Sequence, residues 1–331
     1  MNRVAVIFLI IFIPFLSEAK FKRTKGTVKR RSYSKFSKFI NSSIGQEIGF
    51  GIGSSNYMGE LGGANNKGRP LFFDYELSKT RPLINIFYRN NFTPHLAIRG
   101  DFTYANIAGS DNKTGPGTEF SYEWYRNYRN LSFKSTIFEL AVLGEYNFMR
   151  YAFGRRRSAG FSPYVNTGFA LFYHNPKALY KSPGGQTEWV SLQPLGTEGQ
   201  GLPEYPTKKK YARFQPAIPL AVGVKYKISG VLNFSFELAY RITFTDYLDD
   251  VSTTYVDPSL YSNTITEPDK LAHAIALSRR SVENDPDNTY GYITEPGQQR
   301  GDPRDKDVYF FSGVFKLSYL FKRGRTHSPK F

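Results

Sequence analysis

The feature that most constrains this fold is a set of long stretches in which apolar and polar residues alternate with a period of two. Residues 232–244 show it best: every even position is apolar or aromatic, while the odd positions include Asn233, Glu237 and Arg241. Successive side chains of a β-strand point to opposite faces, so this segment has one apolar and one polar face. Such a strand is typical of a barrel that crosses a membrane, with lipid outside and a polar lumen inside.

Eight stretches of this kind predict an all-β fold, an antiparallel transmembrane β-barrel of eight strands with long extracellular loops. The predicted strands are Gln46–Gly53, Leu83–Phe92, Leu96–Asn106, Ser135–Phe148, Ser162–Tyr173, Pro216–Tyr226, Leu232–Phe244 and Asp307–Phe321. Aromatic residues make up 17% of the chain, which suits strands and the aromatic girdles of a membrane barrel. A soluble β-sandwich rich in Tyr and Phe is the alternative, although sandwiches rarely sustain alternation for so long.

The connections between these strands are alternately long and short. Thr93–His95 and Lys227–Val231 are tight turns, Met149–Phe161 is intermediate, and the other four connections are long. Outer-membrane barrels keep their short turns in the periplasm and place long loops outside, so we expect both termini to be periplasmic. The alternative is a total of ten strands, if Leu71–Leu77 or Glu188–Leu192 forms an extra hairpin beyond the membrane.

The polar face of the strands predicts a charge-balanced lumen. Five acids and five bases are expected to point inward: Glu47, Asp101, Glu139, Glu145 and Glu237, with Arg89, Arg99, Lys225, Arg241 and Lys316. An unpaired charge inside a barrel is costly, and an eight-stranded barrel is only wide enough to be filled by its own side chains. We therefore expect a plugged barrel rather than a diffusion porin.

The ends of the chain predict export. Residues 1–19 combine Arg3, a short apolar run and a small-residue cleavage site, which indicates a secretory signal peptide. A basic periplasmic segment (20–44), the barrel (45–321) and a basic tail (322–331) would follow. No other apolar stretch is long enough for a transmembrane helix. The chain has no cysteine, so neither disulfides nor thiol metal sites contribute.

The formal net charge of +16 would suggest nucleic acid as a partner in a cytosolic protein, but export removes that interpretation. The cations gather instead in the predicted periplasmic parts, whereas the last loop, 244–306, is acidic. They could aid solubility and contact lipid phosphates, or form a basic collar that docks an anionic periplasmic partner. Candidate docking residues are Lys22, Arg23, Arg30, Arg31, Arg150, Arg155, Arg156 and Arg157.

No catalytic or cofactor-binding residue is predicted. His174 is the one histidine expected near a barrel rim, and we interpret it as a solvated loop residue. Asp246, Asp249 and Asp250 could bind Ca²⁺, but their spacing lacks the features of an EF-hand loop, and pairing with loop Arg and Lys is the favoured interpretation, so no metal is predicted. Thr266 and the residues after it predict a capped helix over Glu267–Val282.

Several local strings resemble one family. They are GSSNYMGEL (Gly53–Leu61), LQPLGTEGQG (Leu192–Gly201), FTDYLDDVSTTYVD (Phe244–Asp257), LSRRS (Leu277–Ser281) and YFFSG (Tyr309–Gly313). Together they resemble PorG-like outer-membrane β-barrel proteins of the type IX (Por) secretion apparatus. The resemblance runs from about Gly45 to Phe321.

This resemblance implies a non-enzymatic component of a secretion machine in the outer membrane. Its partners would be a periplasmic ring, formed by a lipoprotein and its partner protein, and outer-membrane lipid. One departure from the family pattern is Arg279, where an acidic residue is expected, so any pairing of that acid with a loop cation would be lost or reversed. A rim-site enzyme acting on lipid A or surface peptides, and a narrow channel or adhesin, are the alternative functions.

Overall fold

The computed structural model describes residues 44–61, 80–113, 117–151, 160–302 and 310–323. The chain divides into two compact units, 1–39 and 40–331, and all described residues belong to the second. The predicted signal peptide and nearly all of the basic segment 20–44 lie outside these ranges. So does the alternative strand Leu71–Leu77. Among the described residues, no helix is long and apolar enough to cross a bilayer.

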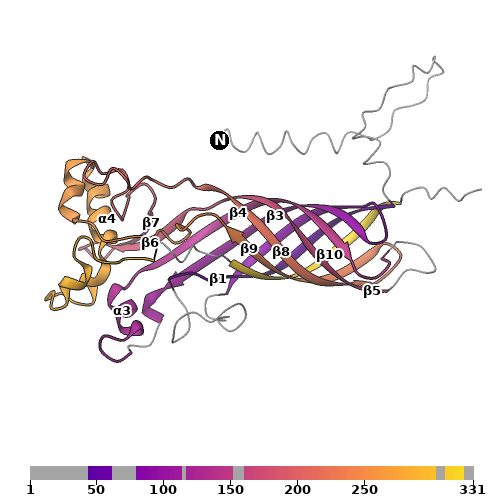
Figure 1. The fold of residues 1–331 in the computed structure, drawn as a ribbon, viewed down its shortest axis with the longest axis horizontal. Helices are drawn as coiled ribbons and strands as arrows, with labels where there is room; N and C mark the ends of the chain where they lie inside the picture. The colour runs from indigo at the N-terminus through magenta and orange to yellow at the C-terminus, as the bar shows by residue number, and fades with distance from the viewer. Residues whose placement is uncertain (1–43, 62–79, 114–116, 152–159, 303–309, 324–331) are drawn as a thin grey trace, which may run out of the picture. The chain divides into compact units, whose positions relative to one another are not determined.

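Eight antiparallel strands close into a barrel (Figure 1). Each pairs with its neighbour in the order β3-β2-β1-β10-β9-β8-β5-β4, and pairing of β3 with β4 closes the circle. The prediction of an all-β antiparallel eight-stranded barrel is confirmed. The strands are β1 (Gly45–Tyr57), β2 (Arg81–Asn91), β3 (Leu96–Ser110), β4 (Ser132–Asn147), β5 (Phe161–Tyr173), β8 (Phe214–Lys227), β9 (Leu232–Thr243) and β10 (Phe310–Arg323).

The predicted strand boundaries differ from the observed ones mainly at the end with the long loops. β1 continues to Tyr57, β3 continues to Ser110 and β4 already begins at Ser132. There the outward positions no longer face lipid, so the alternation that defined the strands fades while the backbone pairing continues. At the other end β10 runs to Arg323, so the first two residues assigned to the basic tail belong to a strand.

The two faces of the barrel wall differ as the alternation predicts. Along β4, Phe138, Leu140, Val142, Gly144 and Tyr146 are exposed, and the residues that alternate with them are buried. At a rise of about 3.3 Å per residue and a tilt of about 40°, the stretch from Phe138 to Phe148 spans about 25 Å along the membrane normal. That height matches the lipid-facing band of outer-membrane barrels.

Aromatic side chains mark both edges of this band. Near the long loops Tyr104, Phe138, Tyr173 and Phe214 are paired in register across four neighbouring strands. The rings of Tyr104 and Phe138 lie 5.3 Å apart, and those of Tyr173 and Phe214 lie 5.2 Å apart. At the opposite edge the exposed aromatics include Tyr146, Phe148, Phe161, Tyr226, Tyr319 and Phe321. Two such girdles are the signature of a transmembrane barrel.

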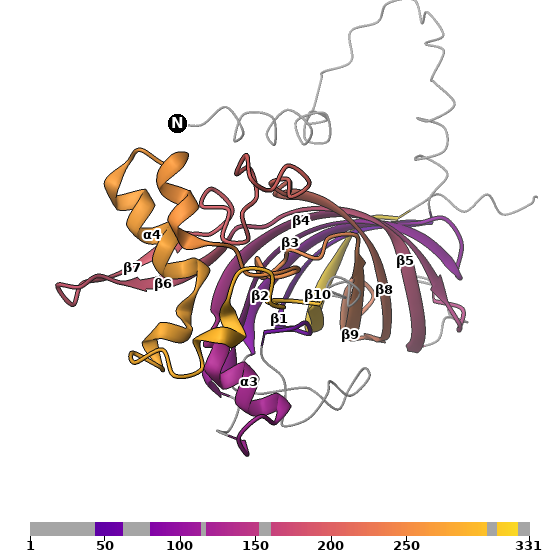
Figure 2. The same cartoon turned by 60° about the vertical axis from the view of Figure 1, so that its left-hand side comes forward.

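The long loops fold into a packed body at one end of the barrel (Figures 1 and 2), called the cap here, made of residues 58–61, 111–113, 117–131, 174–213 and 244–302. Apolar residues from distant segments, such as Leu61, Leu195, Leu248, Val256 and Leu277, share one core that continues into the barrel mouth. Its elements are η3 (Asp111–Lys113), α3 (Tyr122–Arg129), β6 (Pro176–Lys181), β7 (Thr187–Ser191), η4 (Pro258–Asn263), α4 (Pro268–Ser278), η5 (Arg280–Glu283) and η6 (Gly291–Thr294).

Two expectations for the loops need correction or refinement. The helix predicted over Glu267–Val282 is α4 followed by η5, because the backbone at Arg279 leaves the helical region (φ −137°, ψ 88°). Glu267 rather than Thr266 is the N-cap, and it makes no side-chain capping bond. The hairpin β6–β7 overlaps the Glu188–Leu192 segment and extends the sheet beyond β4, so the sheet has ten strands although the barrel has eight.

Candidate functional site

The lumen holds the ten charged residues predicted for it, and all are buried. Glu237 is the centre of one group: it accepts hydrogen bonds from Arg99 Nη1 (2.6 Å), Arg99 Nη2 (3.0 Å) and Lys316 Nζ (2.6 Å). Tyr164 and Asn166 donate to the same carboxylate at 2.8 and 3.0 Å. Five donors on one carboxylate replace the water that the charge loses on burial.

Two further groups complete the lumen network. Arg89 lies between Glu47 (3.0 Å) and Glu145 (3.2 Å), and Lys225 donates to Glu145. Elsewhere Arg241 donates to both carboxylate oxygens of Glu139. The fifth acid, Asp101, pairs with Arg99 at 2.7 Å. Every lumen charge therefore faces at least one opposite charge, and the ten charges balance.

At the end of the barrel with the short turns lies a buried residue that the sequence did not single out. Tyr151, in the connection between β4 and β5, is only 1% exposed and donates a hydrogen bond to Asn233. Its ring packs with Leu320 and Val231. Tyr151 therefore places a buried aromatic side chain inside the mouth at this end of the barrel.

A second polar network lies inside the cap. Glu198 is fully buried and accepts hydrogen bonds from the backbone N–H groups of Ser252 (2.9 Å) and Thr253 (3.0 Å) and from Arg300 Nη1 (3.0 Å). Arg300 also donates to the carbonyl of Asp250. Glu198 thereby joins three segments that are far apart in the chain.

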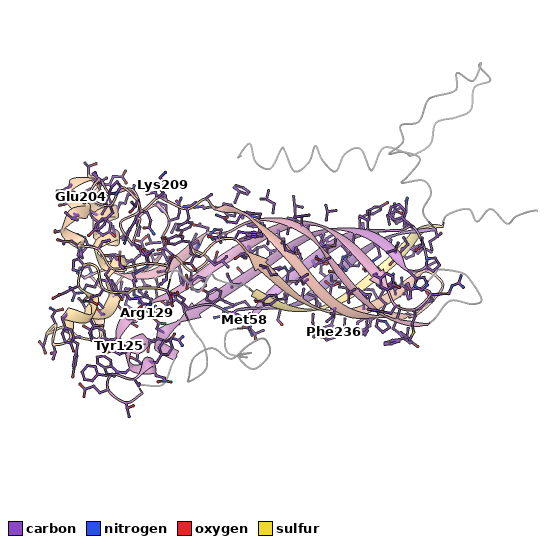
Figure 3. The ribbon with its side chains drawn as sticks, viewed as in Figure 1. Met58, Tyr125, Arg129, Glu204, Lys209 and Phe236 are labelled. Carbon is purple, nitrogen blue, oxygen red and sulfur yellow. The ribbon has the colours of Figure 1, made fainter. Side chains whose placement is uncertain are left out.

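Next to it, Arg129 ties the helix α3 to the rest of the cap (Figure 3). Its guanidinium donates to both carboxylate oxygens of Asp111 at 2.8 and 3.0 Å, and to the carbonyls of Arg300 and Glu60. Asp111 also accepts from the backbone N–H of Leu131. A bidentate pair with further hydrogen bonds is the geometry in which a buried ion pair is best compensated.

The aspartates of the predicted loop cluster are held by hydroxyl groups rather than by Arg or Lys side chains. Tyr57 donates to Asp249 at 2.8 Å, and Thr197 and Tyr211 donate to the two oxygens of Asp250. The direct hydrogen bonds of these two carboxylates therefore come from hydroxyl groups, while Arg129 and Arg300 act on them electrostatically. Among the described residues, no group of three or more His, Asp or Glu side chains is arranged to hold a metal ion.

Burial raises the pKa of several of these acids. The pKa of Glu60 rises to about 8, first because the carboxyl is desolvated and then because Asp249 lies nearby. Burial also raises the pKa of Asp249, and it raises that of Asp250 to about 6 against the opposing effect of Arg300. The base of the cap therefore holds carboxyl groups that titrate near neutral pH.

His174 is not the solvated loop residue that we expected from the sequence. It is fully buried, stacks on Tyr211 (5.7 Å between ring centroids, 19° between planes), and its Nε2 lies 3.4 Å from the Ala212 carbonyl. Burial lowers its pKa to about 4, so the imidazole is neutral at physiological pH. The loop after β5 turns back over the barrel mouth, which a local sequence pattern does not reveal.

Most of the predicted docking residues lie outside the described part of the chain. Of that set only Arg150 is described, and it is exposed in the turn after β4. At the departure from the family pattern, Arg279 donates to Thr294 Oγ1 and Asn288 Oδ1, both at 2.7 Å, and to the Gly291 carbonyl. An acid at this position could not donate these bonds, so the arginine has its own structural role.

Four of the five strings that carry the family resemblance reach the cap, whereas the described residues of the fifth, 310–313, belong to β10. Glu60, Glu198, Asp249 and Asp250 come from three of them and share the buried network, and Ser281 of a fourth hydrogen-bonds Thr294 within the cap. In the sequence, Glu60 and Glu198 stand out only as members of these strings. Their position in strings more specific than barrel alternation was the available signal, whereas nothing in the sequence marks Asp111, Arg129 or Arg300.

A family model described as a domain of unknown function (DUF6089) matches residues 34–188, somewhat less than half of the chain. No curated protein matches.

Among solved structures the chain is similar to Neisserial surface protein A, with 8% identity and a TM-score of 0.37 over 83% of this chain and 97% of that one. It is also similar to the outer membrane protein OprG from Pseudomonas aeruginosa (9% identity, TM-score 0.40, 84% and 97% coverage). A third similar structure is Ail of Yersinia pestis, with 11% identity and a TM-score of 0.34 over 84% of this chain and 99% of that one. The fold assignment rests on the strand pairing and the two faces described above: the protein is a small β-barrel of the outer-membrane type.

Proposed function

We propose that this outer-membrane barrel is a non-enzymatic component of the type IX protein secretion apparatus, where it anchors or organises the periplasmic ring. The observation that carries the proposal is the convergence of three of the five family strings, those of Gly53–Leu61, Leu192–Gly201 and Phe244–Asp257, on one buried network in the cap. Strings that are separate in sequence but interlock in space behave as one folded unit. A resemblance over such a unit is stronger support than the same number of scattered matches.

The lumen supports an anchoring role over a channel. Its charges are neutralised in pairs and its periplasmic end is filled by Tyr151, so the surfaces left for function are the two ends of the barrel. His174 lends no support to the alternative of a rim-site enzyme. It is buried, and its hydrogen bond runs to a backbone carbonyl rather than to a serine or a carboxylate.

Deletion of the gene tests the class of function. Simultaneous loss of many secreted cargo proteins, with unchanged lipid A, is expected for a secretion component. Normal secretion together with altered lipid A would instead support the enzyme alternative and refute the proposal.

The periplasmic docking surface has a separate test. Replacing Arg150, Arg155, Arg156 and Arg157 by glutamate should weaken co-purification of the periplasmic lipoprotein, because an anionic partner would then face like charges. The matched single-site comparison is Arg150→Glu against Lys209→Glu, which reverses an exposed charge on the cap (Figure 3). Unchanged co-purification in the quadruple variant, or equal loss in the cap variant, would count against the basic collar.

A further inference from the structure

The hairpin β6–β7 has two chemically different faces. Ala178 is buried, and Tyr180 and Val190 pack on the core of the cap. On this inner side Tyr180 lies 4.5 Å from the His273 ring, and Glu188, the one acid of the hairpin, lies 2.8 Å from His273 Nε2. This inner face fixes the hairpin to the helix α4. The opposite side of the hairpin faces away from α4, because successive side chains of a strand alternate between its two faces.

The outer face is basic and aromatic. Strand register places Lys177 opposite Ser191, Leu179 opposite Trp189 and Lys181 opposite Thr187, so these side chains share one side of the hairpin. Trp189 is 45% exposed. No acid lies on this side of the hairpin, all of whose residues the structure describes.

This face is continuous with the lipid-facing wall of the barrel. Lys134 belongs to the outward row of β4 and is paired in register with Lys177. Its Nζ lies 3.3 Å from the centre of the Trp189 ring, a cation–π contact. Like charges directly opposite on neighbouring strands are destabilising. A ligand that carries negative charge between the two lysines would remove that penalty.

The position of the face relative to the membrane limits what the ligand can be. Lys134 lies four residues beyond Phe138 of the outer aromatic row, about 10 Å further along the membrane normal at the strand rise and tilt used above. The rest of the hairpin extends beyond it, and Figure 2 shows it projecting sideways from the cap. An interfacial layer of about 5–7 Å covers the hydrocarbon. A small headgroup therefore reaches Lys134 at most, whereas a large saccharide headgroup can span the whole face.

We propose that Lys134, Lys177, Lys181 and Trp189 form a binding surface for the phosphorylated saccharide headgroup of an outer-leaflet glycolipid. The lysines pair with phosphates as compact charges, and the exposed indole offers an apolar platform for a sugar ring. The hairpin thus holds the barrel at a fixed depth and rotation against its lipid. This inference does not depend on the role in secretion.

The chain offers a built-in reporter, because its two tryptophans are Trp124 in α3 and Trp189 in β7. In the Trp124→Phe variant all tryptophan emission comes from Trp189. The folded variant would be reconstituted into phosphatidylcholine liposomes with and without bisphosphorylated lipid A. We expect lipid A to shift Trp189 emission to the blue and to protect it from acrylamide, while Trp124 in the reciprocal Trp189→Phe variant stays unaffected.

Charge variants test the lysines. In the Trp124→Phe background, Lys134→Ala with Lys177→Ala should weaken the lipid A response roughly five-fold for each lysine removed. Lys134→Arg with Lys177→Arg should retain the lipid A response. Lys227→Ala, at the opposite end of the barrel, should leave that response unchanged. Heat-modifiable migration on a gel checks that each barrel is folded.

An unchanged response in the double alanine variant would overturn the proposal. If that variant does not fold, the Trp124→Phe variant with its lysines intact still tests the proposal. Equal quenching of Trp189 by acrylamide with and without lipid A would refute the binding surface.

Discussion

The carboxylate of Glu237 is the group on which the lumen should depend most. Together with Arg99, Lys316 and Asp101 it forms a buried cluster of two positive and two negative charges. Glu237→Gln keeps the shape of the side chain but leaves the cluster with one excess positive charge. It also places an NH₂ group, itself a donor, among five donors.

Removing one partner of a buried pair costs about 3–5 kcal/mol, so Glu237→Gln should destabilise the folded barrel by about that amount. The charge origin of the effect can be isolated by a double-mutant cycle. Lys316→Met alone leaves one excess negative charge, whereas Glu237→Gln with Lys316→Met restores neutrality. The double variant should therefore be at least about 2 kcal/mol more stable than the sum of the single effects predicts.

The assay is urea unfolding of the barrel in lipid vesicles, followed by far-UV circular dichroism. Lys209→Met is the control, since it removes an exposed lysine from the cap and should change the free energy of unfolding by less than about 0.5 kcal/mol. Additive single effects, or a loss below about 1 kcal/mol for Glu237→Gln, would refute the assignment of the lumen as a charge-coupled network.

Three further predictions concern the cap, His174 and the barrel wall. Burial raises the pKa of Glu60 to about 8 and also raises that of Asp249, so the folded cap binds protons that the unfolded chain releases above pH of about 4.5. The cap should therefore lose stability as pH rises from about 5 to 8.5. Amide hydrogen exchange in the cap, corrected for its intrinsic pH dependence, should become faster over this range. Slower corrected exchange at pH 8.5 would contradict the predicted loss of stability. His174→Ala should leave secretion intact. It should lower cap stability by about 1–3 kcal/mol through lost packing, which limited proteolysis measures. Loss of secretion in a variant whose cap remains stable would instead indicate a chemical role for this residue. Gly168→Ala should impair folding by about 1–3 kcal/mol, because its Cβ would lie 2.0 Å from the Val142 carbonyl oxygen, whereas Gly100→Ala meets nothing within 4 Å and serves as the matched control in the same urea assay.

The barrel was predictable because its determinants are local in sequence. Lipid on one side and a polar interior on the other impose a period of two on every strand, so Glu237 and Arg241 could be assigned to the lumen before any pairing was known. The same pattern fails once lipid no longer contacts the wall. That is why the extensions of β3 and β4 beyond Asn106 and before Ser135 were missed.

The cap could not be predicted in this way, since its polar groups are satisfied by partners far along the chain. Glu198 accepts hydrogen bonds from Ser252 and Arg300. Arg129 donates to Asp111 and to the carbonyl of Arg300. His174 shows the same limit. Its environment is made by Tyr211 from the other end of a long loop, and so a residue that looked solvated is buried.

The sequence by itself therefore determined the fold of the wall and the balanced charges of its lumen. Both follow because each strand contacts lipid on one face and the polar lumen on the other. Only the tertiary structure decided that the long loops form one packed cap, that four of the five family strings meet there, and that the β6–β7 hairpin turns a basic, aromatic face outward. These depend on long-range burial, where a polar group is tolerated only if the fold brings it a partner.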